Sequence, residues 1–588
     1  MKTRYRLALI LLAAVLMVNF CACAGKMPAA KPDEQSEKEQ AEQIVSLAPE
    51  SVPAQTAQPV FAPEQDEPML AGNGYFHHRA RTPVALQDMQ CPEITREDFD
   101  TLLDAIRDAA EKNSGAAFHS ACYEVQQAIQ WIETAYVIAS NKNAADPMDD
   151  AIAEQMQELE RFNTEASNLY YGVLHEISCG ENAQILRREF ESEMIAYIEG
   201  FDLTQADQLS KLETEKTELI VRYEQLISED EPAYDEIAEL YVQLVGICQQ
   251  ETELVDYPSY AAYMYDAQYL RDYTPEDAQK IWTIAKENFA PLLHKYIYRV
   301  LKASDKAEER FAFDGSDTAV LQALRHGAHK MSPEIRDACD YLLQYGLYDI
   351  AYSEKKLNQG YTVWMSAYEV PFIFNCPGGY YYDFSDMFHE FGHFTAAFYS
   401  EAGSDFDLED LDLNELQSQG MEVMYFQFYD EIFGEENAAA FRAETLCNLI
   451  NSVVEGALHD EFQQKVFAEE HLTAERATQL FLQTCKEYGI VYYPGLENAW
   501  MNVIHNFETP FYYISYAVSA IPALELFVRQ QEDPAEAMDL YLRICAMNGA
   551  EYYLTDALRE TGLANMMDSP CGDVLVRKIE QTGVLDVH

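Results

Sequence analysis

The sequence predicts a mainly α-helical protein with one small β-sheet. From Thr95 to about residue 345, apolar side chains recur at intervals of three and four, the period of a helix that buries one face. The same period resumes at Asp383 and continues to the C-terminus. Between Gly346 and Asn375, tyrosines and β-branched residues are frequent, which predicts the sheet.

The N-terminal 88 residues have neither pattern. Residues 1–22 resemble an export signal, with three basic residues before an apolar run too short to span a bilayer. A small residue precedes Cys23, so we expect lipidation of Cys23 and a cell-surface lipoprotein anchored to the outer face of the cytoplasmic membrane; an ordinary secreted protein is the alternative. Residues 23–88 are acidic and rich in proline, which predicts a disordered tether.

Residues 89–345 are expected to form an N-terminal helical region. Within it, Leu212, Leu219 and Leu226 recur every seven residues, and Pro232 then interrupts the pattern before another helical segment. These features predict a long helical hairpin in a packed α-helical scaffold.

Composition limits the class of protein and its partners. The chain of 588 residues is 48% hydrophobic and 12% aromatic, enough for a large globular core. Its formal net charge of −60 repels nucleic acid and anionic lipid headgroups, so we expect no nucleic-acid partner and membrane contact only through Cys23. Its twelve cysteines lie singly, which favours small buried hydrophobes over a disulfide framework.

One segment, DFSDMFHEFGHFTAAFY from Asp383 to Tyr399, is predicted to form a helix that carries chemistry. Asp383 and Ser385 offer N-cap oxygens, several phenylalanines provide an apolar face, and Gly403 is a candidate C-terminal stop. The segment contains an H-E-x-x-H motif. We therefore expect its polar residues to share one face of a buried helix.

The H-E-x-x-H motif is typical of a zinc site. His389 and His393 are one helical turn apart and can bind one Zn²⁺, while Glu390 is placed to act as general base on a zinc-bound water. A catalytic zinc needs a third protein ligand, and Glu415 lies 22 residues after His393 in a second predicted helix, for which Asn414 is a candidate cap. We expect one zinc ion per chain; the alternative for Glu415 is a solvated carboxylate.

These residues resemble a known family. HEFGH, followed by the E-x-x-S-Q pattern of 415–419 and by Glu422, looks like the zinc oligopeptidases typified by thimet oligopeptidase and oligoendopeptidase F. PFIFN, at 371–375, is similar to that family's edge strand beside the active site. IHNFETPFYYISYA, at 504–517, resembles its segment rich in histidine and tyrosine, most closely in the oligoendopeptidase F form. The resemblance covers about residues 90 to 588.

The resemblance implies a two-lobed helical zinc-peptidase fold with a deep central cleft, and places the catalytic region at 346–588. It implies a zinc-dependent metalloendopeptidase of short oligopeptides, in which a water activated by Glu390 attacks the scissile carbonyl. A dipeptidyl carboxypeptidase of the same clan and a non-catalytic peptide-binding lipoprotein are the alternatives. The net charge of −60 has two explanations: solubility at a cell surface, or a negatively charged cleft that attracts basic or amine-bearing peptides.

The resemblance also assigns roles to the 504–517 segment. Tyr513 and Tyr516 are the expected hydrogen-bond donors to the oxyanion, and His505 is expected to assist them. Tyr512 is expected to contact substrate, and the choice between Tyr512 and Tyr513 is open because FYYISY spaces its tyrosines differently from oligoendopeptidase F.

Five further residues near the motif are expected to contribute. Phe372 and Phe374 would contact a peptide that pairs with PFIFN as an added strand. Gly392 would let another backbone approach the helix closely, and Glu422 is either a partner of a metal ligand or a solvated carboxylate. Cys376, which follows PFIFN, would make activity sensitive to thiol reagents.

Overall fold

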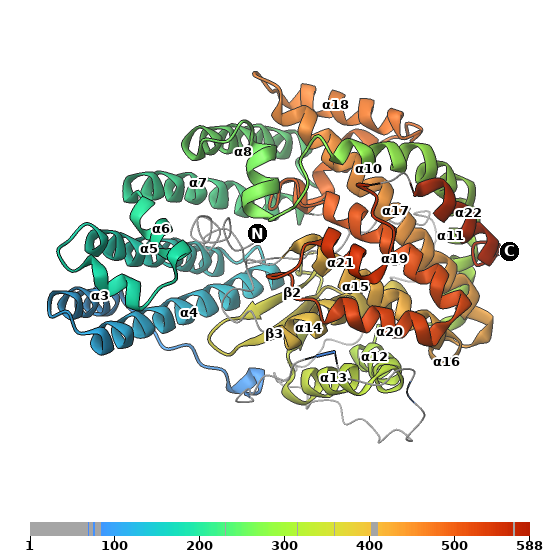
Figure 1. Ribbon diagram of the computed structural model, residues 1–588. Helices are drawn as coiled ribbons and strands as arrows, with labels where there is room; N and C mark the ends of the chain where they lie inside the picture. The colour runs from blue at the N-terminus through green and yellow to red at the C-terminus, as the bar shows by residue number, and fades with distance from the viewer. Residues whose placement is uncertain are drawn as a thin grey trace, which may run out of the picture.

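The computed structural model describes Met69 and residues 75–76, 84–229, 231–313, 315–357, 359–400, 410–568 and 571–587. The predicted signal, Cys23, most of the tether and Gly403 lie outside these residues. Helices dominate the described part, as predicted, and Figure 1 shows α3 to α8 gathered on one side and the C-terminal helices on the other.

The first four helices form a lobe with its own core. They are α3 (Arg96–Glu111), α4 (Gly115–Ala145), α5 (Asp150–Ser178) and α6 (Ser192–Gly200), with a 3₁₀ turn at Ala183–Arg188 before α6. Their inward side chains, such as Phe99, Phe118 and Leu174, form a hydrophobic cluster separate from the rest of the core.

The predicted helical hairpin is confirmed. It consists of α7 (Leu203–Ile227) and α8 (Tyr234–Val255), which pack against each other (Figure 1). Asp202 caps α7 by accepting hydrogen bonds from two backbone N–H groups of its first turn.

The following helices lead into the second lobe. They are α9 (Tyr260–Tyr263), a π-helix at Met264–Gln268, α10 (Ala278–Ile284), a π-helix at Ala285–Phe289, α11 (Ala290–Phe311), α12 (Asp317–Met331) and α13 (Pro333–Tyr345). Their buried side chains share one large hydrophobic cluster with the C-terminal helices and with Tyr223 of α7. The core therefore continues across residue 345.

A three-stranded sheet lies where the sequence predicts it. It contains β1 (Tyr348–Asp349), β2 (Gly360–Met365) and β3 (Val370–Asn375) in the order β1-β3-β2, with β1 parallel and β2 antiparallel to β3. The expectation that PFIFN is an edge strand is wrong. β3 is the central strand because β2 folds back on it in a hairpin and β1 adds on its other side. Among the described residues, β1 and β2 are the two edge strands of this sheet.

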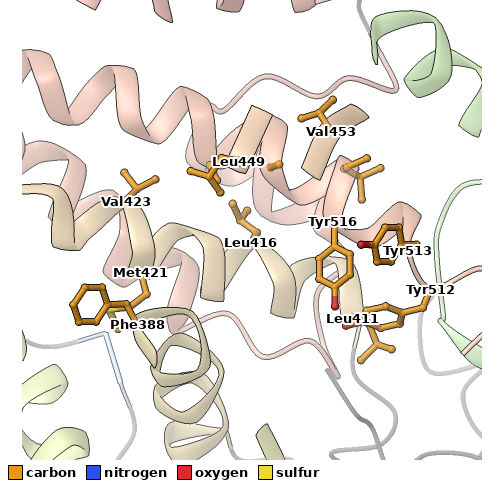
Figure 2. Close-up of a cluster of buried hydrophobic side chains, with 14 of the residues drawn as sticks. Phe388, Leu411, Leu416, Met421, Val423, Leu449, Val453, Tyr512, Tyr513 and Tyr516 are labelled. Carbon is orange, nitrogen blue, oxygen red and sulfur yellow. The ribbon is translucent and has the colours of Figure 1, made fainter. Parts of the chain in front are cut away.

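The remaining helices build the C-terminal half. They are α14 (Tyr382–Tyr399), α15 (Leu411–Tyr425), α16 (Tyr429–Phe433), α17 (Glu435–Phe467), α18 (Ala474–Glu487), α19 (Ile514–Glu532), α20 (Pro534–Cys545), α21 (Leu554–Thr561) and α22 (Gly572–Thr582), with 3₁₀ turns at Phe426–Phe428, Leu496–Asn502 and Ile504–Asn506. Every residue of α15 is buried. Figure 2 shows Leu416 of α15 facing Leu449 and Val453 of α17, so α15 is held inside the core.

Two predicted helix caps are wrong. Asp383 and Ser385 lie inside the first turn of α14, where the Asp383 carboxylate accepts hydrogen bonds from the backbone N–H groups of residues 378–380 and thereby fixes the preceding loop. Asp410, not Asn414, caps α15, since its side chain accepts a hydrogen bond from Leu413 N at 3.0 Å.

The described cysteines follow the prediction of small buried hydrophobes. Ten are described, all are free thiols, and seven are buried. Cys376 is one of the buried residues, and its Sγ lies 3.9 Å from the carbonyl oxygen of Lys356. A search for membrane spans over the described residues finds no helix with the length and apolarity to cross a bilayer.

Candidate metal centre

The site begins with an unusually close contact between α14 and α15. A Cβ atom at Gly392 would lie 2.5 Å from Ser418 Cα and 2.9 Å from Gln417 O, so only glycine allows this separation. The close approach expected at Gly392 is confirmed. It brings the histidines of α14 against the first half of α15.

His389, His393 and Glu415 meet at this contact. Each offers one ligand atom, and the three atoms all lie within 4.8 Å of one another. Glu415 Oε2 is 3.3 Å from His389 Nε2 and 3.8 Å from His393 Nε2. Among the described residues, this is the only group of three or more His, Cys, Asp or Glu side chains with such geometry.

The burial of these atoms fits a metal ion. Among the described residues, the buried Nε2 of His393 has no hydrogen-bond partner and the buried Nε2 of His389 has only the 3.3 Å contact with Glu415, which has no exposed surface. Buried polar atoms normally have partners. Two imidazole nitrogens and a carboxylate oxygen turned toward one point are the donor set of a catalytic zinc site.

The protonation states also fit. Burial lowers the pKa of His393 to about 3, against the opposing charge of Glu415, so its imidazole is neutral. Burial raises the pKa of Glu415, but its contacts with the two histidines and the hydrogen bond from Tyr512 outweigh burial, and the net pKa lies below its usual value. A neutral imidazole and an ionised carboxylate are the forms that bind metal.

His389 is held between two carboxylates. Its Nδ1 lies 2.7 Å from Glu422 Oε1, in addition to the contact of Nε2 with Glu415. Burial lowers the pKa of His389, but the hydrogen bonds and charges of Glu415 and Glu422 raise it well above its ordinary value. A cation bound at Nε2 of His389 would replace the proton on that nitrogen. Glu422 would then fix the orientation of the ring through Nδ1. Of the two readings of Glu422, the structure favours the partner of a metal ligand.

Glu390 is fully buried and oriented by the sheet. Its Oε2 accepts a hydrogen bond of 2.7 Å from the hydroxyl of Thr362 in β2, and the same hydroxyl lies 3.1 Å from its backbone oxygen. Glu390 directly follows His389 on α14, and the Thr362 hydroxyl holds its carboxylate in place. Thr362 had no signal in the sequence.

The 504–517 segment places its side chains against the same group. The Tyr512 hydroxyl donates a hydrogen bond of 2.6 Å to Glu415 Oε1. His505 Nε2 and the Tyr516 hydroxyl are 3.0 Å apart. The Tyr513 ring packs against His459, His505 and Tyr516. Figure 2 shows the three tyrosines grouped beside Leu411 at the start of α15. The structure thus brings Tyr512 to the ligand group directly, and the expected roles of His505, Tyr513 and Tyr516 stay predictions.

Phe372 and Phe374 lie in the core beside the site. They are 4% and 0% exposed, and the Phe374 ring stacks on Tyr361 of β2 at 4.8 Å between centroids. Because β2 already pairs with β3 along its whole length, a peptide cannot pair with PFIFN on that side. Substrate contact by these two rings stays a prediction.

The fold is similar to that of solved peptidase structures. A putative oligoendopeptidase F matches 84% of this chain and 97% of its own, with a TM-score of 0.69 and 20% identity. A putative oligoendopeptidase F from Bacillus anthracis str. Ames matches 85% and 98%, with a TM-score of 0.67 and 15% identity. An M32 carboxypeptidase from Deinococcus radiodurans R1 matches 79% and 98%, with a TM-score of 0.52 and 13% identity.

These likenesses show the fold. The chain has the helical two-lobed architecture of these peptidase structures, as the sequence predicts. No protein-family model matches the sequence, and no curated protein sequence matches it.

Proposed function

We propose that this protein is a zinc-dependent metalloendopeptidase that hydrolyses short oligopeptides. The observation that carries the proposal is the buried convergence of His389, His393 and Glu415, with Glu390 on the same helix. The similarity to two putative oligoendopeptidase F structures supports the same function, since their fold is shared along nearly their whole length.

The proposed mechanism of peptide hydrolysis follows from the negative charge that develops on the scissile carbonyl oxygen. A zinc ion held by His389, His393 and Glu415 would supply a Lewis acid that polarises the scissile carbonyl and acidifies water. Glu390, held by Thr362, is placed to take a proton from the attacking water and to pass it to the departing amine. Its orientation by a hydrogen bond keeps that carboxylate in position without the entropy cost of ordering it at each turnover.

The tyrosines would stabilise the oxyanion. Their hydroxyls are hydrogen-bond donors in a buried site, where such donors act more strongly than in water. Tyr512 donates to Glu415, which leaves Tyr516, paired with His505, and Tyr513 as the proposed donors to the substrate.

A carboxypeptidase is the second candidate. The M32 carboxypeptidase shares the fold at a TM-score of 0.52, and an oligoendopeptidase-F from Enterococcus faecium matches at 0.50, so fold similarity does not separate the two activities. We favour the endopeptidase because the 415–419 pattern and the 504–517 segment resemble oligoendopeptidase F. The two activities differ in their products. Internal cuts give several fragments from one peptide, whereas a dipeptidyl carboxypeptidase removes C-terminal dipeptides in sequence.

Peptide hydrolysis is tested directly with the purified chain. We expect a mixture of unfolded peptides to be cut internally, a chelator to stop the reaction, and stoichiometric Zn²⁺ to restore it. Mass spectrometry of the fragments identifies the cut positions. Stepwise loss of single residues or of dipeptides from the C-terminus would support a carboxypeptidase instead. Peptide binding without any cleavage in the zinc-loaded protein would support the non-catalytic lipoprotein.

We further propose that the enzyme acts outside the cytoplasm as a lipoprotein anchored through Cys23. The support is the sequence of residues 1–23 alone, and the mass of the mature N-terminal peptide tests it. An unlipidated N-terminus would instead indicate a secreted enzyme.

A further inference from the structure

Arg271 is a buried cation behind the candidate metal centre. Its side chain has no exposed surface, and that of its ion-pair partner Asp412 is 1% exposed. The Arg271 Nε donates to Asp412 Oδ1 at 3.3 Å. A buried ion pair is costly to desolvate and persists only where hydrogen bonds satisfy the rest of both groups. The remaining contacts of Arg271 therefore show what the pair holds in place.

Those contacts are with the backbone just before the tyrosine cluster. Nη1 of Arg271 donates to Phe511 O at 3.0 Å, and Nη2 lies 3.4 Å from Tyr512 O and 2.8 Å from the Ser515 hydroxyl. Ser515 in turn donates to Asp412 Oδ1 at 2.5 Å. Only a planar guanidinium offers donors in these several directions at once.

Two further features hold the guanidinium and its partner. The rings of Tyr265 and Tyr269 lie 4.4 Å and 4.7 Å from the Arg271 guanidinium carbon, within cation–π range. The Tyr273 hydroxyl donates to Asp412 Oδ2 at 2.7 Å. Arg271 and these three tyrosines therefore pack as one buried group against the start of α15.

These contacts of Arg271 connect to the candidate ligand Glu415 by two routes, one through Asp412 on α15 and one through Tyr512. Asp412 lies three residues before Glu415 on α15, so the two residues are about one turn apart. Glu415 accepts a hydrogen bond of 2.6 Å from the Tyr512 hydroxyl, and the backbone oxygen of Tyr512 accepts a hydrogen bond from Arg271. The backbone that presents Tyr512 is thereby tied to the helix that presents Glu415.

The backbone that Arg271 holds includes a strained residue, Phe511. Phe511 has a φ of +66°, a left-handed conformation that a non-glycine residue adopts only when its surroundings hold it. Its carbonyl accepts from Arg271, and its N–H donates to Gln463 Oε1 at 2.8 Å. Without Arg271, the chain at Phe511 loses one of the two hydrogen bonds that hold this conformation.

We propose that Arg271 is a positioning residue of the metal centre: it holds the Phe511–Tyr512 backbone against Asp412 and so places the Tyr512 phenol on Glu415. This inference rests on the proposed metal site, and it concerns zinc binding rather than peptide hydrolysis. Arg271 acts through Tyr512, whose backbone it holds against Asp412, and it does not itself contact any of the three candidate ligands.

A double-mutant cycle on zinc affinity tests this assignment. Arg271→Lys, Tyr512→Phe and the double variant are titrated with Zn²⁺ against a chromophoric chelator, without substrate. We expect each single change to weaken zinc binding by about tenfold, the usual effect of losing a hydrogen bond to a ligand. Because Arg271 acts through the Tyr512 phenol, we expect the double variant to bind zinc no more weakly than Tyr512→Phe alone.

A matched control lies in the same half of the molecule. Arg442 also donates to a backbone oxygen, that of Phe426 at 2.8 Å, and pairs with Asp430 at 2.6 Å, with the Tyr429 ring 6.0 Å from its guanidinium carbon. We expect Arg442→Lys to leave zinc affinity unchanged even where it lowers the melting temperature.

The outcomes separate this inference from the proposed function. Zinc affinity that is unchanged in Arg271→Lys, or losses that multiply in the double variant, would overturn the inference. If Arg271→Lys does not fold, Ser515→Ala, which removes one hydrogen bond to Arg271 and one to Asp412, takes its place in the cycle with the same expected result. Wild-type protein that binds zinc without cutting peptides would contradict the proposed activity and leave this test valid.

Discussion

Replacement of Glu390 by Gln is expected to lower turnover by about 10²–10⁴-fold while zinc stays bound. The amide keeps the size of the side chain and a hydrogen-bond acceptor for Thr362, but it cannot take a proton from water. The three candidate metal ligands are untouched, so the zinc content should remain one per chain. Initial rates on a peptide substrate, with zinc measured on the same sample, give both quantities.

The matched control is Glu160→Gln in α5. Glu160 is also a buried glutamate, 4% exposed, with Oε2 lacking a hydrogen-bond partner among the described residues, and it lies between helices of the N-terminal half. We expect its rate to equal that of the wild-type protein. A Glu390→Gln protein with full zinc content and an unchanged rate would show that Glu390 is not the general base.

Replacement of Glu415 by Gln is expected to have a larger effect on the metal than any change outside the ligand group. Loss of a ligand charge from a buried three-residue site should weaken zinc binding by more than about 100-fold, beyond the roughly 10–100-fold that follows loss of a partner of a ligand. Activity at limiting zinc should fall in parallel. Chelator competition measures the affinity, and the rate is followed as zinc is added back.

Glu422→Gln provides the graded comparison. Glu422 touches His389 at Nδ1, on the side of the ring away from Glu415. We therefore expect an intermediate loss of zinc affinity. If Glu422→Gln weakens zinc binding as much as Glu415→Gln, or if Glu415→Gln binds zinc like the wild-type protein, then Glu415 is not the third ligand.

The candidate site could be predicted where local spacing determines it. His389 and His393 share a helix face because four residues make one turn, and Gly392 allows the contact with α15 because it has no side chain. Glu415 was recognisable because a second amphipathic pattern follows at a suitable distance. Each of these features is determined by a short stretch of sequence, and each is present in the folded structure.

The errors came from contacts between distant parts of the chain. Asp383 has the residue type of a helix cap, but the loop at 378–380 uses its carboxylate instead. The sequence of PFIFN predicts an edge strand, but the strand order depends on where β1 joins the sheet. No periodicity relates Thr362 to Glu390 or Arg271 to Asp412, which are 28 and 141 residues apart.

The choice among the clustered tyrosines could not be made from the sequence. Tyr512 and Tyr513 are adjacent and chemically identical, so only the direction of the backbone after Phe511 separates them. That direction places the Tyr512 hydroxyl on Glu415 and the Tyr513 ring against His459.

We expect one zinc ion to bind between α14 and α15. Anomalous diffraction from crystals grown with Zn²⁺, recorded on both sides of the zinc absorption edge, tests it most directly. We predict one strong peak per chain, about 2.0–2.2 Å from His389 Nε2, His393 Nε2 and a Glu415 oxygen. A peak elsewhere with none at these three atoms would contradict the account.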